Sequence, residues 1–209
     1  MGKMKFLACS FLCCIAWIAV AQPAPPPAPA PKAASPASPD PGSVAEGVYR
    51  NPFFGFSYKL PFGWVDRSDD LRQDPAASSK SMVLLSVFEH PPEATTDRLN
   101  SAVVIAVESA SSYPGLKAAA QYFGPLSEVT TAKGLKAINE PYEFPVDAKP
   151  IARQDFAGQV HGLATQQSTL ALLEKGYIIS FTFIANNNDE MVELIEGLTF
   201  GRVKSPPQK

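Results

Sequence analysis

The chain has 209 residues, and its 18 lysines and arginines against 20 aspartates and glutamates give a formal net charge of −2. This mildly acidic balance argues against nucleic acid or an anionic membrane as the partner, because both select a basic face. All three cysteines lie within the first 14 residues. Whether the mature chain has any cysteine chemistry therefore depends on whether these residues are removed.

The N-terminus has the features of a secretory signal peptide. Lys3 and Lys5 form a basic start, residues 6–20 form an uncharged apolar run, and residues 19–21 (Ala-Val-Ala) form a small-x-small cleavage site. The run is about 15 residues long, short of the roughly 20 that span a bilayer. We therefore predict a signal peptide over residues 1–21, cleavage near Ala21 and a secreted protein, periplasmic or at the cell surface. An uncleaved anchor is the first alternative.

Cleavage after Ala21 changes the chemistry of the mature chain. It removes Cys9, Cys13 and Cys14, which excludes disulfides, thiolate catalysis and cysteine metal sites. Lysines and arginines fall to 16, so the net charge becomes about −4. A lipoprotein signal is the second alternative, because these cysteines lie in the apolar run. None of them follows the Leu-small-small residues expected before a lipidated cysteine.

Residues 22–45 are a low-complexity stretch of alanine, proline and serine. Proline runs cannot build a helix or an inner strand, so this stretch predicts an extended spacer with polyproline character. Its expected use is to hold the folded part away from a membrane or cell wall. One domain is then predicted over residues 46–204, large enough to bury a core, with a disordered tail over residues 205–209.

The first half of the domain predicts strands. Residues 54–60 alternate apolar and smaller or polar side chains, and Pro61-Phe62-Gly63 predicts a turn into a return strand at Trp64. An exposed aromatic ligand site at this turn is the alternative to core packing. The polar residues 66–80 predict a loop. Two further strands are expected over residues 81–89 and 102–109.

The second half begins with a predicted helix over residues 115–126. Apolar residues recur there at i, i+3, i+4 and i+7, and Pro125 falls near its end. Residues 139–150 predict turns, and residues 154–160 predict a strand that leads into a long hairpin. Glu174-Lys175-Gly176 fits a three-residue hairpin loop with glycine in the left-handed position.

Residues 177–185 predict the central strand, because they are rich in β-branched and aromatic residues and largely apolar on both faces. A helix follows, capped by Asn187 with Glu190 in the capping-box position. Its apolar stripe is formed by Met191, Leu194, Ile195 and Leu198. Strands, helix, strands and helix in this order predict an α+β fold: an antiparallel sheet with helices packed on its faces, as an α/β/α sandwich.

Several features of the domain match one known family. They are the lead Gly47-x-Tyr49-x-Asn51, the strand and turn Phe56-x-Tyr58-x-Leu60-Pro61-x-Gly63-Trp64, a mid-chain helix ending near Tyr122, and the long hairpin with its terminal helix. Together they resemble the PsbP-like family, which includes extrinsic photosystem II proteins, nuclear Ran-binding proteins, and bacterial secreted proteins and lipoproteins. The resemblance spans most of residues 46–200. It implies an antiparallel sheet between helices and a protein-binding or accessory role without shared catalysis. The metal-retention role of the photosystem members depends on residues that have no match here.

The sequence contains neither Gly-x-Ser-x-Gly nor Ser-x-x-Lys, and His-Glu-x-x-His and the phosphate-loop pattern are also absent. Two sets of side chains have the chemistry of a divalent-metal site. They are Glu89, His90 and Glu93, and the acidic loop with Asp66, Asp69, Asp70 and Asp74. A strand end that passes into a proline-rich loop explains the first set without a metal, and a solvated loop explains the second; both are favoured over a metal site. His161 is expected in a turn, and capping explains the oxygen-rich residues 186–189.

The sequence therefore favours a secreted, non-catalytic accessory or binding domain without a cofactor. Its expected partner is a protein, and we expect no nucleic acid and no membrane insertion of the mature chain. Two alternatives stay open. One is a divalent-metal-binding protein or metal-dependent hydrolase that uses Glu89, His90 or the acidic loop. The other is a carrier of a small apolar ligand, with a cleft lined by Phe53, Phe54 and Trp64. The sequence identifies no catalytic, cofactor-binding or metal-binding residue.

Overall fold

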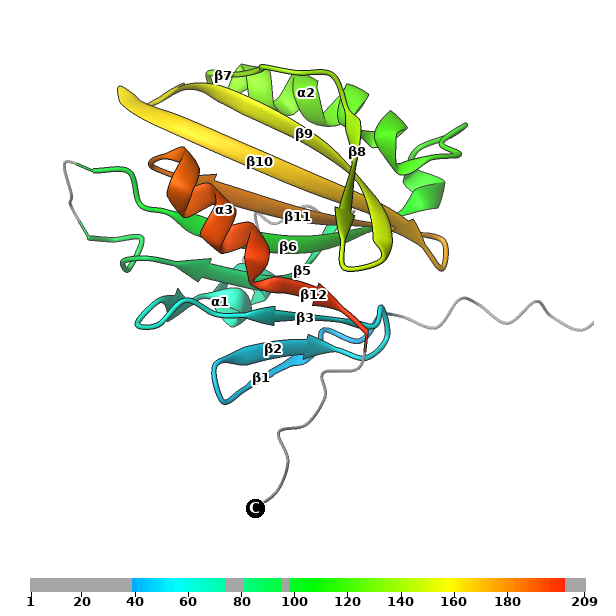
Figure 1. Ribbon diagram of the computed structural model, residues 1–209, viewed down its shortest axis with the longest axis horizontal. Helices are drawn as coiled ribbons and strands as arrows, with labels where there is room; N and C mark the ends of the chain where they lie inside the picture. The colour runs from blue at the N-terminus through cyan, green and yellow to red at the C-terminus, as the bar shows by residue number, and fades with distance from the viewer. Residues whose placement is uncertain (1–38, 74–80, 95–97, 202–209) are drawn as a thin grey trace, which may run out of the picture. The chain divides into compact units, whose positions relative to one another are not determined.

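The computed structural model describes residues 39–73, 81–94 and 98–201. The predicted signal peptide, most of the predicted spacer and the predicted tail lie outside these residues. The described part has the predicted α+β class, with antiparallel strands and three α-helices (Figure 1). The strands form two sheets, whereas the sequence suggested one. No helix of the described residues is long and apolar enough to cross a bilayer.

The larger sheet has the order β4-β5-β6-β11-β10-β9-β7, and β8 pairs with the same edge of β9 as β7. Its strands are β4 Val65–Asp66, β5 Ser81–Phe88, β6 Ala102–Ser109, β7 Leu135–Ala137, β8 Tyr142–Val146, β9 Lys149–Val160, β10 Leu163–Glu174 and β11 Tyr177–Ala185. The predicted central strand is confirmed, because β11 lies between β6 and β10.

The smaller sheet has the order β1-β2-β3-β12. Its strands are β1 Ser43–Ala45, β2 Val48–Asn51, β3 Phe56–Lys59 and β12 Leu198–Phe200. We expected the domain to begin near Glu46, and β1 begins three residues earlier in the chain. The hydroxyl of Tyr49 donates to the carbonyl of Pro41 at 2.7 Å, which fastens the segment before β1 to the sheet.

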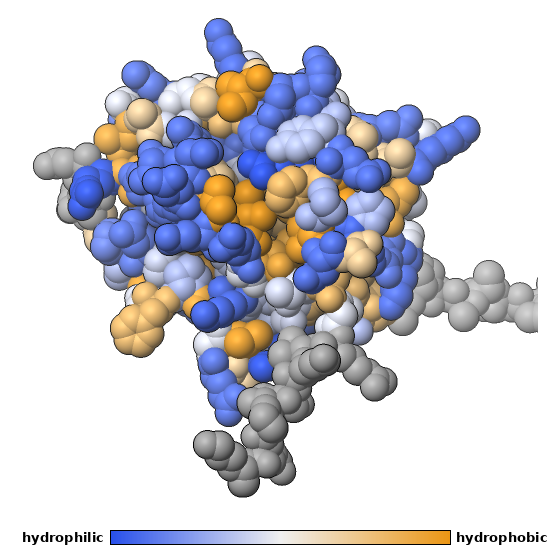
Figure 2. Space-filling view, in the orientation of Figure 1, coloured by the Kyte–Doolittle hydropathy of each residue, from blue (hydrophilic) through white to orange (hydrophobic). Residues whose placement is uncertain are grey.

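The helix α3, Asn188–Glu196, lies against the larger sheet on the same side as the smaller sheet. Its predicted cap is confirmed, because the side chain of Asn187 accepts from the amide of Glu190 at 3.0 Å. The helix ends before Leu198, which the apolar stripe had assigned to it. Gly197 interrupts it beside the smaller sheet: a Cβ there would lie 2.9 Å from the Tyr58 ring. Hydrophilic side chains gather over the outer face of α3 (Figure 2).

The helix α2, Phe123–Ala132, starts eight residues later than the sequence predicted. The apolar spacing before it belongs partly to a 3-10 turn, η2, over Ala119–Tyr122. Pro125 lies in the first turn of α2 rather than near a helix end. A missing N–H costs nothing there, because the first amides of a helix have no partner within it. A second short 3-10 turn, η1, covers Ala110–Ser112.

The predicted loop over residues 66–80 contains a short helix, α1, at Ser68–Gln73. This helix covers the part of β5 that lacks a strand neighbour. Arg72 donates to the carbonyls of Val83 and Leu84 at 3.2 and 3.0 Å, and the Ser68 hydroxyl accepts from the amide of Ser86 at 2.8 Å. The side chains thus replace a strand and protect the sheet edge. The predicted turns over residues 139–150 likewise contain β8 and the start of β9.

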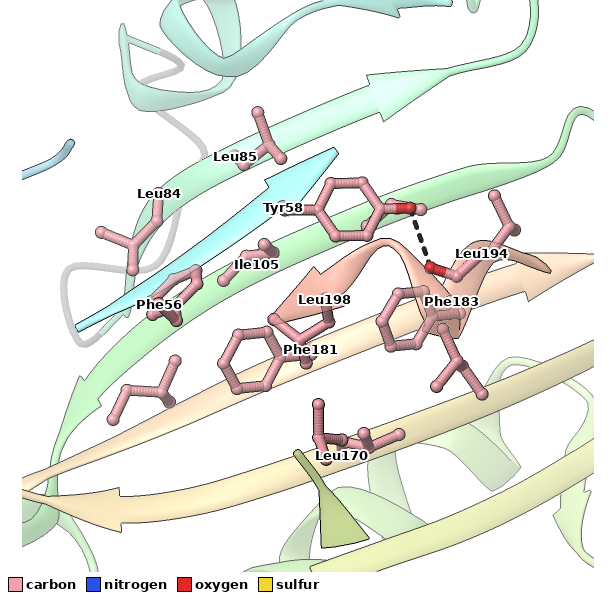
Figure 3. Close-up of a cluster of buried hydrophobic side chains, with 14 of the residues drawn as sticks. Phe56, Tyr58, Leu84, Leu85, Ile105, Leu170, Phe181, Phe183, Leu194 and Leu198 are labelled. Carbon is pink, nitrogen blue, oxygen red and sulfur yellow. Dashed lines mark hydrogen bonds between the residues drawn. The ribbon is translucent and has the colours of Figure 1, made fainter. Parts of the chain in front are cut away.

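The main core lies between the two sheets and under α3 (Figure 3). Phe56 of β3 packs edge-on against Phe181 of β11, with ring centroids 5.0 Å apart. The hydroxyl of Tyr58 donates to the carbonyl of Leu194 at 3.1 Å, which joins β3 to α3. A second core lies under α2 and η2, where Ile178 packs with Tyr122 and Phe123 and with the residues Leu135, Phe156 and Ala171. Both faces of β11 are therefore covered, although Thr182 and Ile184 stay partly exposed.

The long hairpins close through two-residue loops. Lys175 and Gly176 both have positive φ, 52° and 80°, and Glu174 pairs with Tyr177. The prediction of a three-residue loop here is therefore wrong, because only Lys175 and Gly176 lie between the paired residues. Two left-handed residues match the twist of the flanking strands better than a longer loop. His161 and Gly162 form the same type of turn between β9 and β10, which confirms His161 as a turn residue.

Candidate functional site

The structure does not bring Glu89, His90 and Glu93 together as a metal site. The Nε2 atom of His90 lies 3.7 Å from a Glu89 oxygen, and both side chains are largely exposed. Glu93 is engaged elsewhere: both its oxygens accept from Arg67 at 2.6 Å. Asn100 brackets the backbone of His90 with two hydrogen bonds of 2.9 Å. The strand-end interpretation of this segment therefore fits the geometry.

The acidic segment is likewise engaged in local structure. Asp66 accepts from the amide and the hydroxyl of Ser68 and so caps α1. Asp69 pairs with Arg72 at 2.5 Å, and Asp70 pairs with Arg67 at 2.7 Å. Asp74 lies outside the described residues. Among those described, no three histidine, aspartate or glutamate side chains converge as metal ligands would.

The three aromatic residues proposed to line a cleft do not lie together, because Trp64 is apart from Phe53 and Phe54. Phe54 is buried in the main core at 2% exposure, and Phe53 packs edge-on against it at 4.7 Å. Tyr177 completes this cluster, with its ring 5.9 Å from that of Phe54. Trp64 follows the opposite end of β3 and is only partly buried. The single cleft expected from these residues is therefore not formed.

Two polar clusters were not predicted from the sequence, and each joins two elements of the fold. The carboxylate of Glu108 accepts from the hydroxyls of Tyr113 and Tyr122 at 2.5 and 2.8 Å, which ties the segment before α2 to β6. Burial, with the adjacent carboxylate, raises the pKa of Tyr113 to about 12. These tyrosines therefore stay protonated and act as hydrogen-bond donors.

The second cluster centres on Asp155 of β9. Its carboxylate accepts from Asn139 at 2.8 Å, from Arg153 at 2.8 Å and from Tyr142 at 3.2 Å. Burial opposes ionisation of Asp155, but the nearby Ser168 hydroxyl and the hydrogen bonds from Asn139 and Arg153 outweigh it and lower its pKa. The guanidinium of Arg153 also lies over the ring of Phe144, 4.8 Å from its centroid. The cluster fastens β8 to β9, so its role is structural.

A hollow of about 890 Å³ is the strongest candidate for a binding site. It lies between the β3–β4 turn, the β1–β2 hairpin and the C-terminal end of α3. Its apolar lining includes Leu60, Phe62, Trp64 and Leu194. The carboxylates around it are Glu46, Glu89, Glu190, Glu193 and Glu196, and Lys59 is the single basic residue among them. This combination of apolar and charged lining was not visible in any one stretch of sequence.

Phe62 is the most unusual residue of this hollow, because its side chain is fully exposed. Pro61 restricts the entry to the turn, and Gly63 takes a φ of 83°, so the backbone reverses and carries the ring outward. Figure 2 shows an apolar side chain standing clear of the surface where β3 leads into β4. Leaving a phenylalanine ring in water forfeits about 2 kcal/mol of burial. An exposed ring at the rim of a hollow is typical of a binding surface.

No family model matches this chain, and no curated protein matches it. Among solved structures, it is similar to cyanobacterial PsbP (CyanoP) from Synechocystis sp. PCC 6803, with a TM-score of 0.50 and 14% identity over 76% of this chain and 96% of that one. It also matches LpqN, involved in cell envelope biogenesis of Mycobacterium tuberculosis, with a TM-score of 0.41 and 12% identity over 78% of this chain and 87% of that one. At such identities the likeness concerns the fold alone, and the first match confirms the fold that the sequence resemblance implied.

Proposed function

Starting from this PsbP-like fold, we propose that the protein is an exported, non-catalytic binding domain that holds a protein partner at the hollow beside Phe62. The observation that carries the proposal is the fully exposed Phe62 ring at the rim of an 890 Å³ hollow. Rigid aromatic side chains contribute much of the affinity at protein interfaces when a partner buries them. A partner that binds here would bury this ring, whereas the fold itself leaves it exposed.

A metal-dependent hydrolase has less support. Arg67 holds Glu93 and Asp70, and Asp66 accepts from Ser68. Glu89 and His90 lie beside each other, but no third histidine or carboxylate of the described residues joins them. A small-ligand carrier has less support as well, because Phe54 is part of the core at the far end of β3 from Trp64. A carrier that used Phe54 would require this ring to leave the core.

Export is the second part of the proposal. It is supported by the basic start, apolar run and cleavage site of residues 1–21 and by the proline-rich residues 22–45. N-terminal sequencing of the protein recovered from the secreted or periplasmic fraction tests it. We expect the mature chain to begin at Gln22. A chain that keeps Met1 and stays in the cytoplasm would remove this part of the proposal.

The binding role is tested by comparing co-purification on the wild-type protein with that on Phe62→Ala, in the producing organism. We expect at least one protein to be retained on the wild type and reduced about tenfold on the variant, the size expected for an aromatic anchor. Val129→Ala is the matched control, because Val129 is also an exposed apolar side chain but lies on α2. Equal retention on wild type and Phe62→Ala would contradict a binding role for this hollow.

A further inference from the structure

We infer that the occupant of the hollow is a basic segment of a protein partner, with lysine or arginine heads at the carboxylates and their aliphatic stems on Phe62 and Trp64. This inference rests on the proposed function and names the partner's chemistry. It combines three features of the described residues: the charge around the hollow, the electrostatics of the end of α3, and the aromatic lining.

The charge around the hollow is unbalanced. Glu46, Glu193 and Glu196 are exposed, and none of them forms an ion pair with another described residue. Glu190 is used differently, since its carboxylate accepts from the amide of Asn186 at 2.8 Å as part of the α3 cap. The charges elsewhere in the fold are often matched, as in the Arg153–Asp155 pair. The hollow therefore presents a negative surface whose complement is cationic.

The end of α3 adds to this imbalance. The C-terminal end of a helix carries partial negative charge, which lysine or arginine side chains usually complement. The last turn of α3 holds no basic residue and instead carries Glu193 and Glu196, three positions apart and on one face. These carboxylates are unfavourable for the isolated helix. A cation placed at this end would interact favourably with both carboxylates and with the helix terminus.

The arrangement favours an extended ligand over a single ion. No three of these carboxylates converge closely enough for a metal in the described part of the chain. They instead surround an open hollow with an apolar lining of Leu60, Phe62 and Trp64. Lysine and arginine match such a surface, because their aliphatic stems pack on apolar groups and their heads favour aromatic faces and carboxylates. A peptide segment supplies several such side chains at intervals.

Trp64 allows a direct test. It is the only tryptophan of the chain from Gln22 to Lys209, since the other tryptophan, Trp17, lies in the predicted signal. Its fluorescence therefore reports on the hollow alone. We propose titrating this chain with short blocked peptides of three compositions: alternating lysine and leucine, alternating glutamate and leucine, and alternating serine and leucine. Spermidine is the fourth probe, as a polycation without a peptide backbone or apolar side chains.

We expect only the lysine peptide to change the emission of Trp64 in a saturable way, and the effect to be lost near 1 M salt, where the Debye length is about 3 Å. Glu193→Gln and Glu196→Gln should each weaken binding about two- to fivefold, as expected for exposed charge pairs. Glu128→Gln should leave binding unchanged, because this exposed glutamate lies on α2.

Each other outcome overturns the inference in a distinct way. Equal binding of the lysine and serine peptides without salt dependence would leave an apolar site and refute a cationic partner. Binding of spermidine as strong as that of the lysine peptide would replace the peptide segment with a polyamine. No response to any probe would also refute the inference. Equal binding of the lysine and serine peptides, or no response to any probe, would not decide the proposed binding role. That role is tested separately, by co-purification of a partner with the wild type and with Phe62→Ala.

Discussion

The two ends of β3 carry similar aromatic residues, but those at one end are covered by other elements and the one at the other end is exposed. At the start of the strand, Phe53 and Phe54 pack with Tyr177, and Lys175 lies over the Phe53 ring at 4.8 Å and donates to the Phe53 carbonyl. The β10–β11 hairpin thus closes that end. At the other end, Phe62 has no such cover from any described residue. The neighbouring elements therefore decide whether an aromatic residue packs into the core or stays at the surface.

The largest expected effect comes from removing the ring at the closed end. Phe54→Ala should lower the free energy of unfolding by about 3–5 kcal/mol, because the ring is buried at 2% exposure and its loss leaves a cavity. Phe62→Ala should change the free energy by no more than about 0.5 kcal/mol. Urea denaturation followed by circular dichroism measures both. Similar losses for the two variants would show that Phe62 also belongs to the core.

A smaller effect is expected from Tyr58, which fastens the middle of β3 to α3. Burial raises its pKa, so the hydroxyl remains protonated and donates to the carbonyl of Leu194. Tyr58→Phe keeps the ring and should cost about 1 kcal/mol. Tyr142→Phe removes a longer and more exposed hydrogen bond, 3.2 Å to Asp155, and should cost less, about 0.5 kcal/mol, in the same denaturation assay. Equal costs would mean that the buried Tyr58 hydroxyl bond adds no more to stability than the exposed one.

An effect of similar size is expected at the open end itself. Gly63→Ala should cost about 1 kcal/mol, through the positive φ alone, because a Cβ there would meet no atom within 4 Å. Gly124→Ala is the matched control: it also meets no atom, but its φ is not positive, so α2 should gain stability. Thermal unfolding of the two variants should shift in opposite directions. A shift of Gly63→Ala to higher temperature would contradict the turn geometry.

Much of the closed part could be predicted from sequence. Residues 177–185 carry enough β-branched and aromatic side chains to specify an interior strand, and Asn187 with the apolar stripe specifies a capped helix. Three of the residues that carried the PsbP-like resemblance, Tyr49, Asn51 and Tyr58, are buried. These features depend on short stretches of sequence or on burial in one core. They can therefore be predicted without knowing which other elements pack against them.

The open part could not be predicted in the same way. The sequence predicted the turn at Pro61-Phe62-Gly63 and left an exposed aromatic site there as the alternative to core packing. The reversal at Pro61 and Gly63 turns the Phe62 ring outward. The carboxylates around it come from the β1–β2 hairpin, the end of β5 and α3, which lie far apart in the chain. The helix α1 was missed for a related reason, because its six residues are defined by capping and by β5 rather than by apolar spacing.

We propose that the Phe62 end of β3 meets a partner and the Phe53 end does not. The most direct measurement places a photo-crosslinking amino acid at position 62 or at position 53 of the full chain, in cells of the producing organism. We predict a discrete crosslinked adduct from position 62 and none from position 53. An adduct from position 53 with none from position 62 would contradict the claim, as would irradiated protein that stays uncrosslinked at both positions.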